Sequence, residues 1–248
     1  MSSNQVLDLK MLKKFRNELT RFMMLYQFGI DELNTKIDIL KQEFQYIHDY
    51  SPIEHVKSRI KSPESILKKM QRKNLDYSLS SIKENIKDIA GIRITCSFIS
   101  DIFEISRMLE NQSDIEVVEK KDYINHPKPN GYQSLHLIVK IPVFMSNGIE
   151  NVYVEVQIRT IGMDFWASLE HKIYYKFENE VPSHLSKELK NAADTVAMLD
   201  RKMEALHEEI RKIDSDEDGF EDSLKLLNST SQPLNIPMAL LESLSKTK

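Results

Sequence analysis

Hydrophobic and polar residues alternate with a period of two in the segment 152–160, which predicts a β-strand. One face carries the aliphatic residues Val152, Val154, Val156 and Ile158. The other face carries Tyr153, Glu155, Gln157 and Arg159. A strand face that only meets solvent is expected to carry Thr, Lys or Ser. A carboxylate, an amide and a guanidinium in line therefore indicate a functional site.

A second predicted strand, residues 91–98, has the same pattern. Its apolar face carries Ile92, Ile94 and Cys96, and its polar face carries Arg93 and Thr95. If the two strands are neighbours, Glu155 and Asp88, which lies in the preceding turn, can hold one Mg²⁺, because Mg²⁺ binds hard oxygen ligands. The alternative is two solvated carboxylates on an ordinary sheet, which is favoured for either acid alone and much less for the pair.

Apolar spacings of three and four residues predict a helical region over residues 1–50, with Gly29 as a break between two pieces. Strands are predicted near residues 54–61, 91–98, 115–120, 134–142 and 151–160. Helices are predicted near residues 63–73, 80–87, 101–110 and 163–176. This order mixes helices and strands around one sheet.

Beyond Pro182, spacings that alternate between four and three residues are typical of a heptad helix, here over residues 183–213. The apolar positions are Leu185, Leu189, Ala192, Val196, Leu199, Met203, Leu206, Ile210 and Ile213. Such a seam can pack on the first helices of the same chain or join another subunit. Residues 214–222 form an acidic run and residues 228–233 (NSTSQP) have little apolar content, which predicts a flexible tail over residues 214–248.

Composition narrows the class of protein. A chain of 248 residues with 41% hydrophobic residues can bury a sizeable core. Its start is polar and it has no apolar run near the ~20 residues of a membrane span, so we expect a cytoplasmic protein without membrane contact. Cys96 is the only cysteine, which excludes a disulfide framework. The net charge of −4 argues against a general DNA or RNA binder, while RNA as a regulator stays open.

Positive charge is nevertheless concentrated between His55 and Lys73, where Glu64 is the single acid. His55, Lys57, Arg59 and Lys61 alternate along a predicted strand, and Lys68, Lys69, Arg72 and Lys73 lie on adjacent turns of the helix that follows. Basic side chains from two elements can thus converge on phosphates. The alternative is a solvated helix face with extended lysines.

The loop at residues 122–136 is dense in polar side chains. Asn130 and Gly131 supply a tight turn, and Tyr132 follows where a flat ring has room to stack on a base. His136 lies on the polar side of the next strand. Taken alone, Tyr132 is more often a packing residue. The chain has neither a phosphate-binding P-loop nor a G-x-G-x-x-G motif, so side chains must hold any phosphates.

Five segments together resemble the synthetase domain of RelA/SpoT-type alarmone synthetases. They are 58–62 (SRIKS), 88–93 (DIAGIR), 130–136 (NGYQSLH), 155–160 (EVQIRT) and 163–171 (MDFWASLEH). The resemblance runs in order over about residues 50–177. The short length, without an upstream hydrolase domain, is similar to the stand-alone small alarmone synthetases, and within them to the branch called RelP or SAS2 (small alarmone synthetase 2).

The resemblance implies transfer of pyrophosphate from ATP to the 3′-hydroxyl of GDP or GTP, which gives ppGpp or pppGpp and AMP in stress signalling, without hydrolase activity. Asp88 and Glu155 are then the Mg²⁺ ligands, and Glu155 is also the candidate base. On the ATP side, Arg59 and Arg93 clasp adenine, and the phosphates are held by Lys61, Ser65, Lys69 and Arg72. On the GDP or GTP side, Tyr132 stacks on guanine beside Lys128, His136 and Gln157. Supporting roles fall to Arg159, Glu170 and His171.

The resemblance also implies an α+β fold, in which a mixed sheet flanked by helices forms a catalytic domain over residues 51–177, similar to polymerase-β-type nucleotidyltransferases. It further implies a homotetramer joined through terminal helices. A tetramer of this kind favours the alternative in which the heptad seam of residues 183–213 contacts another subunit. Gln133 stands where many small synthetases have Arg, so their regulation and acceptor preference do not carry over directly.

Two rival functions are disfavoured. A template-independent nucleotidyltransferase is expected to show a Gly-Ser helix start followed by a D-x-D strand, and neither is present. A non-catalytic RNA-binding module is expected to carry net positive charge with interleaved aromatic residues, whereas this chain is acidic overall.

Overall fold

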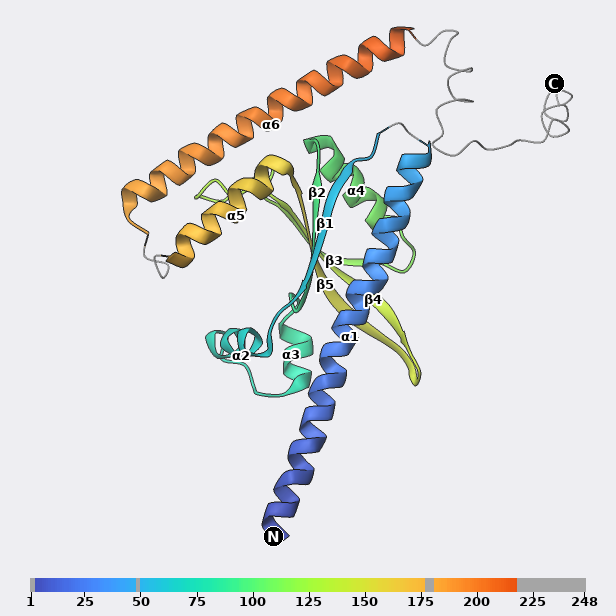
Figure 1. Ribbon diagram of the computed structural model, residues 1–248, viewed down its shortest axis with the longest axis vertical. Coiled ribbons are helices and arrows are strands. Elements are labelled where there is room, and N and C mark those ends of the chain that lie inside the picture. The colour runs from blue at the N-terminus through green and yellow to red at the C-terminus, as the bar shows by residue number, and fades with distance from the viewer. Residues whose placement is uncertain (1–2, 48–49, 177–180, 218–248) are drawn as a thin grey trace, which may run out of the picture. The chain divides into compact units, whose positions relative to one another are not determined.

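A computed structural model describes residues 3–47, 50–176 and 181–217 of the chain (Figure 1). The chain divides into two compact units, one through Glu204 and one from Ala205 onward. The first unit contains a five-stranded sheet with order β1-β2-β5-β4-β3. Its strands are β1 (Ile53–Ile60), β2 (Ala90–Cys96), β3 (Glu116–Asp122), β4 (Leu135–Met145) and β5 (Gly148–Thr160). Strands β2 and β5 are parallel and the other neighbouring pairs are antiparallel, which confirms the predicted mixed sheet.

Six helices accompany the sheet in the described residues, and the predicted N-terminal and C-terminal helices are among them. They are α1 (Ser3–Ile47), α2 (Pro63–Arg72), α3 (Leu79–Asn85), α4 (Ile99–Glu110), α5 (Ile161–Lys176) and α6 (Ser183–Glu217). The heptad helix thus extends four residues beyond its predicted end at residue 213. Residues 218–248, the rest of the predicted tail, lie outside the described residues.

The core lies on the apolar face of the sheet, as the two-residue period predicts. Val154, Val156 and Ile158 of β5 are fully buried, and so are Ile94 and Cys96 of β2. Helices α1 and α4 both contact β2 and β5. Burial raises the pKa of the Cys96 thiol, so this cysteine is an inert core residue. The polar side chains of β5 project from the opposite face.

The predicted break at Gly29 is wrong, because α1 is continuous from Ser3 to Ile47 (Figure 1). A Cβ atom at Gly29 would lie 2.5 Å from Cγ2 of Val152 on β5. The absence of a side chain at Gly29 therefore lets α1 approach β5 closely. A glycine in a helix costs about 1 kcal/mol relative to Ala, which packing along a long helix outweighs.

Side chains from separate elements satisfy the exposed backbone groups at helix starts. Ser62 caps α2 through its Oγ, which accepts from the backbone N–H of Ser65, and Pro63 occupies the first turn as predicted. At the start of α4, Glu204 of α6 accepts from the backbone N–H groups of Ile99 (2.7 Å) and Ser100 (3.1 Å). These two bonds join Glu204, the last residue of the first unit, to the start of α4.

Helix α6 also packs on α5 within the same chain. Trp166 and Ala167 of α5 form a small cluster with Ala193, and Trp166 Nε1 donates to the carbonyl of Leu189 (2.9 Å). Part of the predicted seam is therefore used within the chain, against α5 and not against the first helix. Further along, Leu199 is 55% exposed and Met203 is 45% exposed, so this part of the seam has an open apolar surface.

Asp200 links α6 to the end of β5, where its Oδ2 accepts from Thr160 Oγ1 (2.7 Å). Burial raises the pKa of Asp200 above its ordinary value of 3.8. The folded state thus binds the proton more tightly than the unfolded state, a contribution present below pH 3.8 and lost as pH rises through the raised pKa. Asp200→Asn is expected to raise the melting temperature at pH 7, and thermal unfolding at pH 7 and pH 3 should show the gain shrinking in acid. A lower melting temperature at pH 7 would show that the Thr160 bond outweighs burial.

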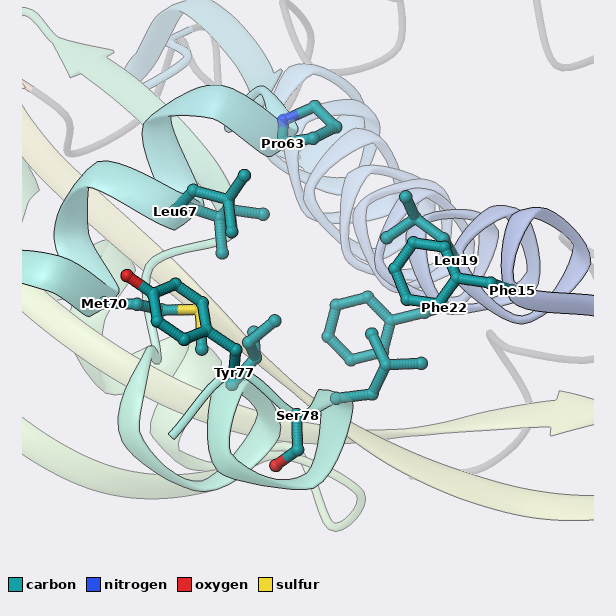
Figure 2. Close-up of a pocket in the computed structure, with 11 residues that line it drawn as sticks. Phe15, Leu19, Phe22, Pro63, Leu67, Met70, Tyr77 and Ser78 are labelled. Atoms are coloured by element: carbon teal, nitrogen blue, oxygen red, sulfur yellow. The ribbon is translucent and has the colours of Figure 1, made fainter. Parts of the chain in front are cut away.

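An apolar groove of about 190 Å³ lies between α1, α2 and α3. Figure 2 shows Leu67 and Met70 of α2 and Tyr77 on one side, with Leu19 and Phe22 of α1 on the other. The lining contains no charged side chain. This groove is therefore unsuited to nucleotide phosphates, which need cationic groups or backbone donors.

Candidate active site

A polar groove of about 200 Å³ lies on the other face of the sheet, over β1, β2 and β5. Its polar lining comprises Lys57, Ser58, Arg59, Arg93, Glu155 and Gln157. The strand register explains this convergence, since Lys57 pairs with Arg93, and Arg93 with Gln157. The sheet therefore brings together four of the predicted site residues, Arg59, Arg93, Glu155 and Gln157, as the shared strand period indicates.

Asp88 lies just before β2 and is held by two lysines. Nζ of Lys61 lies 2.5 Å from Asp88 Oδ2, and Nζ of Lys69 lies 2.6 Å from the same oxygen. Burial alone would raise the pKa of Asp88, but the two ammonium groups outweigh it and lower the pKa. Oδ1 of Asp88 is buried and has no hydrogen-bond partner among the described residues. Asp88 is therefore an ionised carboxylate with one oxygen left over.

Glu155 lies at the centre of the polar face of β5. Its Oε2 accepts from Gln157 Nε2 (2.9 Å), and its Oε1 lies 3.6 Å from Nδ1 of His136 on β4. Burial would raise the pKa of Glu155, and the charge of Asp88 adds to that, but His136 and Gln157 outweigh both and lower it. Glu155 is thus ionised at neutral pH and lies close enough to Asp88 for their charges to interact.

Arg159 organises the far end of this face and is only 4% exposed. Its Nη2 donates to the hydroxyl of Tyr132 (2.6 Å) and to Gln157 Oε1 (2.7 Å). Its Nη1 lies 3.2 Å from Asp164 Oδ1, and its Nε donates to Ser134 Oγ (3.3 Å). The guanidinium is thus almost fully buried, and each of its three nitrogens contacts a neighbouring side chain.

The loop that carries Tyr132 is held from three sides. Gly131 has φ of +88°, which disfavours other residues, and a Cβ there would lie 2.5 Å from Ala193 Cβ of α6. Glu170 of α5 accepts from Asn130 Nδ2 (3.0 Å). Gln133 Nε2 donates to the carbonyl of Ile124, which joins the two ends of the loop. Specific contacts therefore join the loop to α5, to α6 and to its own start.

The Tyr132 ring belongs to an aromatic and cationic cluster. Nζ of Lys128 lies 4.8 Å from its centroid and 4.7 Å from that of Tyr123. The Tyr132 hydroxyl lies 2.8 Å from Nε2 of His136. The structure thus brings together the predicted contacts for GDP or GTP, which are Lys128, Tyr132 and His136. Lys128 lies over the Tyr132 ring, on which a guanine base would have to stack. Stacking on guanine stays a prediction.

Three predicted residues lie at the margin. Ser65 and Arg72 are exposed on α2, on the helix face that also carries Lys69, and His171 is exposed on α5. The structure also places in the site two residues, Lys57 and Asp164, to which no individual role was assigned from sequence. Lys57 lines the polar groove, a position that its alternation with Arg59 and Lys61 could have predicted. Asp164 joins two arginines, which no local pattern reveals.

The carboxylates fit a magnesium ion. No cluster of three or more His, Cys, Asp or Glu side chains suited to a metal occurs in the described residues. Asp88 and Glu155 lie close enough for their charges to interact. Two carboxylates with phosphate oxygens and water are a usual Mg²⁺ set, because Mg²⁺ retains several waters. The buried, unpartnered Oδ1 of Asp88 is an oxygen that such an ion would satisfy.

Comparison with known proteins identifies the family. The model for the region found in RelA/SpoT proteins matches residues 58–180. The chain is 52% identical over 204 residues to the GTP pyrophosphokinase YwaC of Bacillus subtilis (strain 168), covering 82% of this chain and 95% of that protein. The chain belongs to the RelA/SpoT family. The resemblance inferred from the five sequence segments is thereby confirmed.

Solved structures of this RelA/SpoT family share the fold. The crystal structure of small alarmone synthetase 2 from Bacillus subtilis matches with a TM-score of 0.69 and 51% identity, over 75% of this chain and 97% of that one. Small alarmone synthetase 1 from the same organism, bound to its product pppGpp, matches with a TM-score of 0.72 and 37% identity, over 78% and 98% of the two chains. The likeness to the former agrees with the predicted branch.

Membrane insertion has no support in the helices. Within residues 3–47, 50–176 and 181–217, none of them combines the length and apolar character of a membrane span.

Proposed function

We propose that this chain synthesises (p)ppGpp by transferring the pyrophosphate of ATP to the 3′-hydroxyl of GDP or GTP, with release of AMP. The observation that carries the proposal is the polar groove, in which Arg59, Arg93 and Glu155 converge beside Asp88 and its lysines. Family membership and the pppGpp bound to small alarmone synthetase 1 of Bacillus subtilis support the same reaction.

The donor side is formed by β1, β2 and α2. Arg59 and Arg93 flank the groove and offer planar guanidinium groups that can stack on adenine, which Lys cannot do as well. Lys61 and Lys69 stand at Asp88 and can turn to the phosphates of ATP, with Ser65 and Arg72 further along the same helix face. Phosphoryl transfer relies on such positioned positive charge, because negative charge spreads over the transferring group.

The acceptor side is formed by β4, β5 and the Tyr132 loop. Tyr132 would stack on guanine, while Lys128, His136 and Gln157 contact the nucleotide. Glu155 would accept the proton of the 3′-hydroxyl as its oxygen attacks the β-phosphorus of ATP. The bond between that phosphorus and the oxygen bridging to the α-phosphorus then breaks, and AMP leaves. Glu155 is ionised at neutral pH, as a proton acceptor must be, and lies beside His136.

Mg²⁺ is the proposed cofactor, held by Asp88 and Glu155. When bound, it would neutralise oxygens of the β- and γ-phosphates of ATP. Asp88 would offer its unpartnered Oδ1 to the ion, while Lys61 and Lys69 contact its other oxygen, Oδ2.

The reaction is tested by incubating the purified protein with ATP, Mg²⁺ and either GDP or GTP, and separating the products by anion-exchange chromatography. We expect ppGpp or pppGpp together with an equal amount of AMP. Pyrophosphate release and an extended nucleotide chain would indicate a nucleotidyltransferase instead. No turnover with either acceptor would contradict the proposal.

Tyr132→Ala is expected to weaken GDP binding by about 5- to 150-fold, because stacking on an aromatic side chain contributes ~1–3 kcal/mol per base. ATP affinity should change little, since the Tyr132 loop lies on the acceptor side. Tyr132→Phe is the matched control, because it keeps the ring and removes only the hydroxyl shared with Arg159 and His136. Isothermal titration with each nucleotide measures both affinities. Equal weakening of ATP and GDP by the alanine variant would contradict the guanine assignment.

We propose that this enzyme acts as a homotetramer in the cytoplasm. Leu199 and Met203 of α6 are exposed, as are Ile161 and Phe165 on α5. A Cβ atom at Gly162 would lie 2.9 Å from Val196 Cγ1, so the first turn of α5 adjoins α6. Exposed apolar side chains on two adjoining helices favour contact with another subunit over exposure to water.

A further inference from the structure

Asp164 lies in the first turn of α5 and contacts two arginines from different strands. Its Oδ1 lies 3.0 Å from Nη1 of Arg93 on β2 and 3.2 Å from Nη1 of Arg159 on β5. One carboxylate oxygen thus receives both guanidinium groups. The Asp164 side chain is 16% exposed, so water screens these contacts only weakly.

The two arginines depend on this carboxylate electrostatically. Burial lowers the pKa of Arg159 and the charge of Arg93 lowers it further, whereas Tyr132 and the charge of Asp164 oppose these effects. Without Asp164, two positive groups would face each other in a largely buried place. The position of Asp164 near the start of α5 is itself favourable, because the N-terminal end of a helix attracts negative charge.

The contacts of Asp164 with Arg93 and Arg159 connect the two halves of the groove. On one side, Arg93 lines the groove where adenine is proposed to bind. On the other side, Arg159 donates to the Tyr132 hydroxyl and to Gln157, both on the acceptor side. Gln157 in turn donates to Glu155. A continuous run of polar contacts therefore leads from the ATP side through Asp164 to the acceptor platform and the candidate base.

We propose that Asp164 is a positioning residue that couples the two nucleotide sites, so that ATP held against Arg93 fixes Arg159 and Tyr132 for the acceptor. The proposal rests on the proposed function, because it takes Arg93 as an ATP contact and Tyr132 as a guanine contact. In this proposal Asp164 acts through the two arginines and not through contact with a nucleotide. Coupling between binding sites is reciprocal, so GDP should tighten ATP binding by the same factor as ATP tightens GDP binding.

The test measures GDP affinity by isothermal titration with and without a saturating ATP analogue that has a methylene bridge between its α- and β-phosphates. In the unmodified protein, the analogue should tighten GDP binding by about fivefold or more, which is within the usual range of coupling. In Asp164→Asn, which removes the charge and keeps the size, the ratio of the two GDP dissociation constants should fall to about one. Asp194→Asn removes an exposed acid of α6 and should keep the full ratio.

An unchanged ratio in Asp164→Asn overturns the proposal, since a merely structural role would lower stability without removing coupling. A ratio near one in the unmodified protein overturns it too, while leaving synthetase activity intact. If the unmodified protein binds neither nucleotide, the proposed function itself fails. If circular dichroism shows that Asp164→Asn does not fold, Asp164→Glu replaces it, because a longer carboxylate keeps the charge and moves the oxygen. Asp164→Glu should also reduce the ratio, and full coupling in that variant would overturn the proposal.

Discussion

Glu155→Gln is expected to slow (p)ppGpp synthesis by ~100-fold or more while leaving a folded protein that still binds nucleotides. The change keeps the size of the side chain and removes the charge that a metal ligand and a base both need. It also keeps a group that can bond to Gln157, so the polar face of β5 should stay intact. Initial rates with ATP and GDP at saturating Mg²⁺, beside circular dichroism, measure the effect.

Glu150→Gln is the matched control, because Glu150 is on the same strand and its partners are Arg21 and Lys83, outside the polar groove. Its rate should remain within about twofold of the unmodified protein, since exposed ion pairs contribute little. Activity of Glu155→Gln within a fewfold of that of the unmodified protein would remove Glu155 from the mechanism.

The second large effect concerns assembly. Leu199→Lys is expected to yield a smaller species at micromolar concentration, because the open apolar seam would receive a charge. Burying an unpaired ammonium costs several kcal/mol unless the side chain extends to water. Leu199 is more than half exposed in the single chain, so the fold of the subunit should tolerate the change. Light scattering read beside circular dichroism separates loss of assembly from loss of helix.

Asp194→Lys is the control for this variant, since Asp194 is exposed and lies five residues before Leu199, toward the opposite side of α6. It should assemble as the unmodified protein does. If Leu199→Lys lowers thermal stability without a discrete smaller species, the seam packs within one chain. An assembly of unchanged size and stability would contradict both readings of the seam.

The two-residue period made the sheet and much of the site predictable. It placed Glu155, Gln157 and Arg159 on one face of β5 and Arg93 on the matching face of β2, and the structure pairs those strands. Periodicity works here because side-chain direction in a strand follows from position alone. The assignment of individual roles, such as metal ligand or base, came from the resemblance and stays a prediction.

Local sequence patterns could not predict the contacts between elements that are distant in the chain. Gly29 suggests a break because glycine weakens an isolated helix, yet its function is the approach to Val152, more than a hundred residues away in sequence. Asp164 reads as an ordinary acid in a first helical turn, and only the fold shows that it faces Arg93 and Arg159. The heptad seam revealed an apolar face of α6, but whether α5 or a second subunit covers each part depends on packing.

The parallel pairing of β2 with β5 has a consequence for how the enzyme matures. The hairpin of β4 and β5 joins residues that are near each other in the chain, so it can form early. Pairing β5 with β2 must close a long loop that contains α4, β3 and β4, and such non-local contacts form slowly. Arg93 and Glu155 meet only through that pairing. A chain still emerging from the ribosome therefore lacks the assembled groove until β5 is complete, and production of the alarmone must wait for the finished fold.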